Sequence, residues 1–188
     1  MSVRALAVGL GLALLAACSN EPAPIMGRSA LQSVALHSSD GRELSIGSLR
    51  GRPTLLFFGF THCPEVCPLS LLKAVQLKQR LGPLADSLQV VFVTVDPRRD
   101  TPAHLRQYLA AFDPAFIGLA GDEAGTRAVA ESLGVSYRQV GEGETATFEH
   151  TASWFLLGAD GTLQEVLGYA LSDAQMEARL RARLASNP

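Results

Sequence analysis

Two cysteines, Cys63 and Cys67, lie four positions apart directly after the apolar run of residues 57–60. Four residues bring two side chains to one face of a helix, and a compact turn between Pro64 and Pro68 would also bring the sulfurs together. Such a pair can close as a disulfide or hold a soft metal ion. Candidate redox or metal chemistry therefore follows a strongly apolar predicted strand.

The position of Pro68 predicts where the next helix begins. Proline deep in a helix removes a hydrogen bond, so the regular helix should begin near Cys67, with residues 61–66 forming a loop. Cys67 would then lie at the positive end of the helix. Exposed amides and the helix dipole favour the thiolate there, so we expect the pKa of Cys67 to fall below its free value of about 8.5.

A third ligand decides how well two thiolates hold Cu(I) or Zn(II), and the chain has four histidines. His104 is expected in the first turn of a surface helix and His37 beside a turn, where a solvated role is expected for both. His62 adjoins Cys63, and its side chain is expected to point away from its neighbour's. His150 opens a predicted strand, and the loop end of this strand is expected to face the cysteine loop. It is the best candidate for the third ligand.

The amino-terminal segment has the organisation of a secretion signal. Arg4 precedes the uncharged stretch 5–17, which is too short to span a bilayer as a helix. Small residues precede Cys18, and the segment resembles a bacterial lipoprotein signal, in which that cysteine becomes the lipid-modified amino terminus. An ordinary secretory signal with an idle Cys18 is the alternative. The expected organisation is a signal peptide over 1–17, a tether over 18–30 and one folded domain over 31–188.

Composition narrows the functional classes. A length of 188 residues suits one well-buried domain. The 16 Lys and Arg against 18 Asp and Glu give a net charge of −2 without a basic run, so we expect no nucleic-acid partner. If Cys18 carries lipid, Cys63 and Cys67 are the only thiols of the domain. Outside the cytoplasm such a pair tends to oxidise, so a thiolate role needs an external reductant.

The apolar pattern predicts alternating strands and helices. Residues 54–60 and 89–95 are nearly continuous in Leu, Phe and Val, as expected of central strands covered on both faces. A hairpin is expected from residues 31–37 and 43–46. A helix over 69–81 would carry Leu69, Leu72, Leu77 and Leu81 on or near one side. The other expected elements are helices starting at Pro102, over 123–133 and after a capping box at Ser172–Gln175, and strands over 116–119, 137–140, 152–157 and 163–167.

This order of elements predicts an α/β three-layer sandwich with an N-terminal β-hairpin. A cysteine pair after the first central strand of such a chain indicates a thioredoxin-like arrangement.

Three segments resemble the Sco/SenC family of copper chaperones for cytochrome c oxidase: residues 51–68, residues 93–102 and His150. The resemblance covers roughly residues 30 to 185. Its combined motifs are highly specific, whereas a lone Cys-x-x-x-Cys would be weak. It implies a thioredoxin-like fold, a membrane-tethered domain outside the cytoplasm, and one copper ion, Cu(I) or Cu(II), held by two cysteines and a histidine. On this chain the implied ligands are Cys63, Cys67 and His150.

Asp96 matches the first aspartate of the family's Asp-Pro-x-x-Asp-Thr-Pro segment, which implies that it tunes the site from nearby. Taken alone, it would be only a residue of a strand-to-helix turn. The chain departs from the family in having Glu149-His150-Thr151 where Asp-His-Ser is usual, a lipoprotein signal in place of a transmembrane helix, and no tyrosine-rich character over residues 141–147. These departures leave the ligands intact.

The resemblance implies a metallochaperone that delivers copper to the dinuclear copper site of cytochrome c oxidase, lipid-anchored on the periplasmic side of a bacterial membrane. It would be a binding and transfer protein rather than an enzyme with turnover. Its partners would be the oxidase's copper-site subunit and a periplasmic copper donor or thiol reductant.

The main alternative is a thiol-disulfide oxidoreductase that uses Cys63 and Cys67 to reduce the cysteines of the oxidase copper site. Dithiol exchange needs no imidazole, so His150 separates the two functions. A peroxidase is disfavoured because Thr61 lies two residues before Cys63, whereas peroxiredoxins place a threonine three before. A disulfide with a purely structural role in the loop would leave the matches at Asp96 and His150 unexplained.

Overall fold

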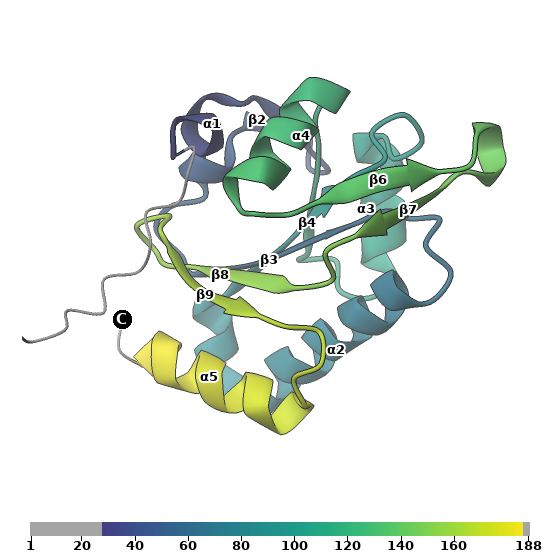
Figure 1. Ribbon diagram of the computed structural model, residues 1–188. Helices are drawn as coiled ribbons and strands as arrows, with labels where there is room; N and C mark the ends of the chain where they lie inside the picture. The colour runs from purple at the N-terminus through teal and green to yellow at the C-terminus, as the bar shows by residue number, and fades with distance from the viewer. Residues whose placement is uncertain (1–27, 186–188) are drawn as a thin grey trace, which may run out of the picture.

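A seven-stranded mixed sheet forms the centre of the computed structural model, which describes residues 28–185 (Figure 1). Its strand order is β2-β1-β5-β4-β3-β8-β9. The central strands β3 (Thr54–Gly59) and β4 (Gln89–Thr94) pair in parallel and are almost wholly buried, as their continuous apolar sequences predict. β5 (Ile117–Ala120) extends the parallel part of the sheet beside β4.

The two edges of the sheet are antiparallel. β8 (Trp154–Leu157) and β9 (Leu163–Leu167) follow β3 on one side. On the other side, β1 (Leu36–Ser38) and β2 (Glu43–Leu44) form the expected N-terminal hairpin. Its first strand begins later than predicted, because α1 (Arg28–Ser33) occupies the start of that segment and packs against α4.

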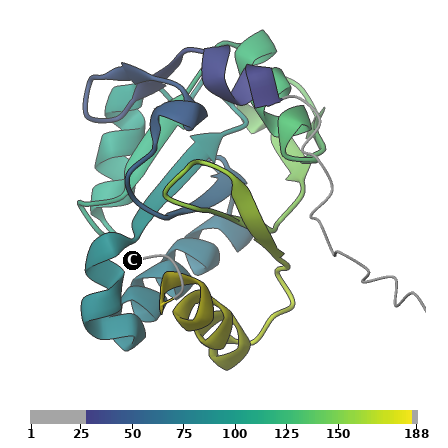
Figure 2. The ribbon, with the colours of Figure 1, turned by 90° about the vertical axis from the view of Figure 1, so that its left-hand side faces the viewer.

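Helices cover both faces of the sheet and complete three layers (Figure 2). α2 (Val66–Leu81) and α5 (Asp173–Ala185) pack together on one face, and α1 packs with α4 (Glu123–Ser132) on the other. The expected capping box begins α5: the Ser172 amide donates to Gln175 Oε1 at 2.9 Å, and the Gln175 amide donates to Ser172 Oγ at 3.3 Å. The remaining elements are α3 (Pro102–Ala110), which packs on β5, and the short 3-10 helices η1 (Ile46–Ser48), η2 (Gly82–Ser87) and η3 (Gly143–Thr145).

α2 begins at Val66, so the prediction of a start near Cys67 is confirmed. The predicted apolar side of this helix is wrong for Leu69 and Leu72, which are 49% and 47% exposed. At 100° per residue, the stripe that enters the core is instead the one that begins at the buried Cys67. Its other buried members are Ser70, Leu71, Ala74, Leu77 and Leu81.

A separate two-stranded ribbon, β6 (Tyr137–Val140) and β7 (Thr147–His150), extends from the body of the molecule (Figure 1). His150 was expected to open the strand over 152–157. It is instead the last residue of β7, where it pairs with Tyr137, and β8 begins at Trp154. His150 therefore belongs to the ribbon and not to the seven-stranded sheet.

No helix within residues 28–185 is long and apolar enough to cross a membrane. The expected signal peptide over 1–17, the lipid-modified Cys18 and all but the end of the tether over 18–30 lie outside the described residues.

Candidate thiol and metal site

The two cysteines meet at the carboxyl end of β3. Cys63 lies in the loop after the strand and is half-buried, while Cys67 is the second residue of α2 and is fully buried. The amide of Cys67 donates a hydrogen bond to Cys63 Sγ over 3.4 Å. No disulfide joins Cys63 and Cys67 in this structure.

His150 completes the group, because its Nε2 lies 3.8 Å from Cys67 Sγ. Its Nδ1 lies 3.1 Å from the carbonyl oxygen of Thr151. A carbonyl can only accept, so Nδ1 carries a proton, and Nε2 is the ring nitrogen that faces the sulfurs. The structure thus brings together the three residues that the sequence marked as candidate ligands.

Aromatic rings of β3 and its following loop hold the imidazole in place. The ring of His150 lies edge-on to Phe57 and to Phe60, with centroids 6.1 Å and 6.2 Å away. Phe60 in turn packs against Phe148 of the same ribbon at 5.3 Å. This apolar wall restricts both the ring orientation and the access of water.

Gly59, the last residue of β3, leaves the space that Cys67 fills. A Cβ at this position would lie 2.8 Å from Cys67 Sγ and 2.7 Å from Cε2 of Phe92. Both distances are shorter than van der Waals contact. The backbone of Gly59 is not in the left-handed conformation that favours glycine. The glycine is therefore required because it allows the helix to approach the strand closely.

The two thiols differ in acidity, and in the opposite sense to our expectation. The hydrogen bond from the Cys67 thiol lowers the pKa of Cys63 to about 4, helped by His150 and by the amides of Cys67 and Glu65 and opposed by desolvation. The pKa of Cys67 is raised, because its thiol donates to Cys63 and is buried. The amides at the start of α2 stabilise the thiolate of Cys63, not that of Cys67. The prediction of a thiolate at Cys67 is therefore wrong.

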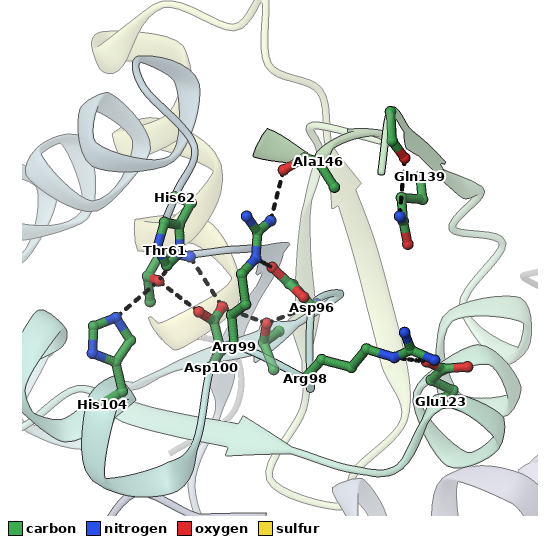
Figure 3. A network of polar contacts seen from close by, with 12 residues as sticks. Thr61, His62, Asp96, Arg98, Arg99, Asp100, His104, Glu123, Gln139 and Ala146 are labelled. Atoms are coloured by element: carbon green, nitrogen blue, oxygen red, sulfur yellow. Dashed lines mark hydrogen bonds and ion pairs between the residues drawn. The ribbon is translucent and has the colours of Figure 1, made fainter. Parts of the chain in front are cut away.

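Asp100 fixes the loop between β3 and the cysteines. Its buried carboxylate accepts from the Thr61 amide at 3.0 Å, the Thr61 hydroxyl at 2.5 Å and the Thr94 hydroxyl at 2.6 Å (Figure 3). Of the Asp-Pro-x-x-Asp-Thr-Pro segment, only the first aspartate was predicted to act near the site. The second aspartate of the same motif was the available signal for Asp100.

Asp96 connects the sheet to the ribbon that carries His150. Its carboxylate, only 5% exposed, forms an ion pair with Arg99, and Arg99 Nη2 donates to the carbonyl of Ala146 at 2.7 Å (Figure 3). Ala146 lies immediately before β7. Asp96 and Arg99 therefore tie the ribbon to the end of the sheet, and Arg99 is a second residue that the sequence reasoning missed.

The other histidines lie elsewhere. His62 and His104 are exposed, and both contact the hydroxyl of Thr61 (Figure 3). Their rings are 6.0 Å apart. The described contacts of His62 are thus with Thr61 and His104, consistent with the expectation that its side chain turns away from Cys63. His37 is exposed on β1.

Two thiols and an imidazole meet at the end of a central strand of this thioredoxin-like sheet. This arrangement defines a class of proteins that exchange thiols with disulfides or bind soft metal ions. The family model described as SCO1/SenC matches residues 28–185. The chain belongs to the SCO1/SenC family, which confirms the resemblance noted in its sequence.

Relatives and solved structures agree with this assignment. An SCO2-like protein of Rickettsia felis is 36% identical over 129 residues, which cover 67% of this chain and 63% of that protein's length. The structure of Bradyrhizobium japonicum ScoI with copper bound is 36% identical and has a TM-score of 0.72, with 80% of this chain and 96% of that chain covered. BsSco, a member of the Sco family of cytochrome c oxidase assembly proteins, shares the fold at 21% identity, with a TM-score of 0.62 and coverage of 80% and 91%. The thioredoxin-like fold prediction is therefore confirmed.

Proposed function

We propose that Cys63, Cys67 and His150 hold one copper ion. The observation that carries this proposal is the position of His150 Nε2, which faces Cys67 Sγ at 3.8 Å with Nδ1 directed at a carbonyl. Two sulfurs and one imidazole nitrogen form a soft donor set, which suits Cu(I). The thiolate of Cys63 supplies the negative charge that binding requires.

The same proposal assigns the protein to delivery of copper to the dinuclear copper site of cytochrome c oxidase. It is supported by membership of the SCO1/SenC family and by the copper-bound state of the ScoI structure. Cys18 would anchor the domain by lipid on the periplasmic side of the membrane, with residues 1–17 removed as the signal peptide. The partners would be the copper-site subunit of the oxidase, a periplasmic copper donor and a thiol reductant.

Thiol-disulfide exchange is a second candidate function, favoured by the unequal acidity of the two cysteines. The Cys63 thiolate would attack a disulfide of the oxidase copper site, forming a mixed disulfide and releasing one target thiolate. Cys67 would lose its proton and attack Cys63 Sγ, releasing the second target thiolate. The target gains two electrons, and the Cys63–Cys67 pair becomes the disulfide.

Replacement of His150 by Ala separates the two functions. The variant keeps both thiols, so dithiol exchange should survive with a shifted reduction potential. Copper delivery should fail, because the variant lacks one of the three ligands. Mutation of a residue that only hydrogen-bonds to a metal ligand already lowers metal affinity by about 10–100-fold, and loss of a ligand should lower it at least as much. We expect Cu(I) affinity, measured against a competing chelator under reducing conditions, to fall at least about 100-fold.

The matched control is His37→Ala, an exposed histidine on β1, which is separated from β3 by β5 and β4. It should leave Cu(I) affinity, reduction potential and oxidase activity in cells unchanged. Wild-type oxidase activity in cells despite a collapsed Cu(I) affinity of His150→Ala would reject copper delivery and favour the oxidoreductase. An unchanged Cu(I) affinity would reject His150 as the third ligand.

Oxidation gives an independent test of the sulfur ligands. A disulfide removes both thiolates, so the reduced protein should bind one Cu(I) per chain at this site and the oxidised protein none. Cys63→Ser and Cys67→Ser should each lose tight Cu(I) binding, because a hydroxyl is a poor ligand for a soft ion. Equal Cu(I) uptake before and after reduction would contradict the proposed ligands.

A further inference from the structure

A second group of ligand-bearing side chains lies outside the thiol site. His62, Asp100 and His104 each direct one ligand atom to a common point, and these atoms all lie within 4.8 Å of one another (Figure 3). They come from the loop after β3, the segment before α3 and the first turn of α3. None of the three belongs to the set Cys63, Cys67 and His150.

The Thr61 hydroxyl marks the point where the three groups converge. Thr61 Oγ1 lies 3.1 Å from His62 Nδ1, 3.0 Å from His104 Nε2 and 2.5 Å from Asp100 Oδ1. Ligand atoms around a tetrahedral ion at about 2.0–2.1 Å are roughly 3.4 Å apart, so the group must contract by about 1.5 Å at most. Rotation of the two exposed imidazoles can supply this contraction, provided that Thr61 Oγ1, which occupies this point, turns away or becomes the fourth ligand.

Asp100 is already held in position for such a role. Its Oδ2 accepts from the Thr61 amide and the Thr94 hydroxyl, while its Oδ1 accepts only the Thr61 hydroxyl. A carboxylate oxygen has lone pairs for more than one partner, so Oδ1 can also bind a cation. The hydrogen bonds to Oδ2 would fix the carboxylate orientation, as outer partners of metal ligands usually do.

The charge of Asp100 is the second reason to expect a cation. The side chain is fully buried, and no Lys, Arg or His forms an ion pair with it within residues 28–185. Its described partners are neutral donors: two hydroxyls and one amide. Buried carboxylates are usually paired with a cation or coordinate a metal, and here two exposed imidazoles lie within reach of the carboxylate.

We propose that His62, Asp100 and His104 form a second metal site that takes a divalent ion of the Cu(II) or Zn(II) class. Two imidazole nitrogens and one carboxylate oxygen are borderline to hard donors, which suit divalent ions better than Cu(I), and Cu(II) should bind more tightly than Zn(II). The site contains no sulfur, so formation of a Cys63–Cys67 disulfide does not remove its ligands. His62 directly precedes Cys63, so the two sites share one loop.

The test uses the full chain, untagged and in detergent, with all three cysteines replaced by serine so that no thiol binds metal. Cu(II) alone is titrated at neutral pH by calorimetry and by electron paramagnetic resonance. We expect one equivalent of Cu(II) with hyperfine coupling to two imidazole nitrogens. Zn(II) alone should compete for the same equivalent and bind more weakly.

Variants identify the ligands. In this cysteine-free background, His104→Ala and His62→Ala should each weaken Cu(II) binding by about 10-fold or more. His37→Ala is the matched control, because it removes another exposed histidine on a distant strand, and it should have no effect. His104 is exposed in the first turn of α3, so the fold should survive; His104→Gln and circular dichroism check this.

Several results would overturn the second site. Absence of the Cu(II) equivalent would do so, as would equal weakening by His104→Ala and His37→Ala, which indicates adventitious binding to surface histidines. A loss of Cu(I) binding in His104→Ala with native cysteines would assign His104 to the thiol site instead. If His104→Ala keeps Cu(I) binding and loses Cu(II) binding, the protein has two separate sites. This conclusion does not depend on whether the protein delivers copper to the oxidase.

Discussion

At the scale of single residues, the two cysteines have different chemical roles. Cys63 is half-buried and accepts hydrogen bonds, whereas Cys67 is buried beneath β3 and donates one. The more exposed partner is therefore the nucleophile and the buried partner its proton donor. This difference between the cysteines suits a metal site that the ion enters from the Cys63 side. It also suits a disulfide exchange reaction that begins with attack by Cys63.

The asymmetry predicts how alkylation of the reduced protein depends on pH. Because the pKa of Cys63 is lowered to about 4, its thiolate should already predominate in mildly acidic solution, where an ordinary thiol is protonated. Peptide mapping after brief iodoacetamide treatment should show modification of Cys63 that rises around pH 4 to 5 and then levels off, with Cys67 protected. Reaction that rises only above pH 8, or modification of Cys67 first, would contradict the assignment.

The residues of the thiol site could be predicted from sequence, but their acidity could not. Cys63, Cys67 and His150 stand in motifs whose residue types and spacing are specific. Which thiol ionises depends on which sulfur is buried and which amides face it, and these follow from tertiary packing. Asp100 also stands in a motif, but its hydrogen bonds with Thr61 join segments 39 positions apart, so the sequence could not show which residue this carboxylate holds.

At the scale of elements, the site depends on how closely α2 approaches the end of β3. Gly59→Ala should place a methyl group against Cys67 Sγ and Phe92, so α2 or the ring must shift. Overpacking of this kind costs about 1–3 kcal/mol. Urea unfolding should show this loss, and Cu(I) affinity should fall because Cys67 is displaced.

The control for this change is Gly168→Ala. A methyl group added at Gly168 would meet no heavy atom within 4 Å, and the φ of this glycine is not positive. The stability and Cu(I) affinity of the variant should remain near those of the wild type. If Gly59→Ala behaved in the same way as Gly168→Ala, close packing at the strand end would not position Cys67.

The ribbon that carries His150 gives a second prediction at this scale. Arg99→Gln removes the ion pair with Asp96 and the hydrogen bond to Ala146, and leaves a buried carboxylate without its partner. Loss of one member of a buried pair costs about 3–5 kcal/mol. Because the Arg99 side chain is 19% exposed, we expect the lower end of this range in urea unfolding, together with faster hydrogen exchange in β7.

Arg98→Gln provides a matched control from the neighbouring position. Arg98 pairs with Glu123, but the two side chains are 79% and 64% exposed. Exposed pairs contribute about 0–1 kcal/mol, so this variant should unfold almost as the wild type does. Equal effects of the two substitutions would show that Arg99 does not restrain the ribbon.

The order of central elements could be predicted because β3 and β4 are continuous apolar runs and α2 follows a proline-bounded loop. The ribbon could be predicted only in part. Its strands are short and half exposed, so no apolar alternation separates β7 from the following β8. The contact of Arg99 with Ala146 joins residues 47 positions apart, and single-chain periodicity carries no sign of it.

At the scale of the whole molecule, the three-layer sandwich and its N-terminal hairpin agree with the prediction from the sequence. The sandwich could be predicted because right-handed crossovers leave few arrangements for this order of strands and helices. The place of α1 against α4 could not, because residues 28–33 have no strong pattern of their own.

The proposed lipid anchor is tested on the intact protein. Mass spectrometry of native protein from membranes should find Cys18 at the amino terminus with acyl chains attached, and Cys18→Ser should move the protein to the soluble fraction. One chain alone gives only weak membrane binding, so stable retention requires more than one. A native product that begins elsewhere and carries no lipid would reject the anchor.

The separate ribbon has a consequence for the speed of metal exchange. The sulfurs belong to the loop after β3 and to α2, whereas the imidazole belongs to a two-stranded unit, and such units have little stability of their own. Local opening of the ribbon therefore costs far less free energy than global unfolding. The proposed copper site would thus release its ion by withdrawing His150 alone, at a rate set by the contacts of Phe148 and Ala146 with the body, while the loop and the helix that carry the two thiols stay folded.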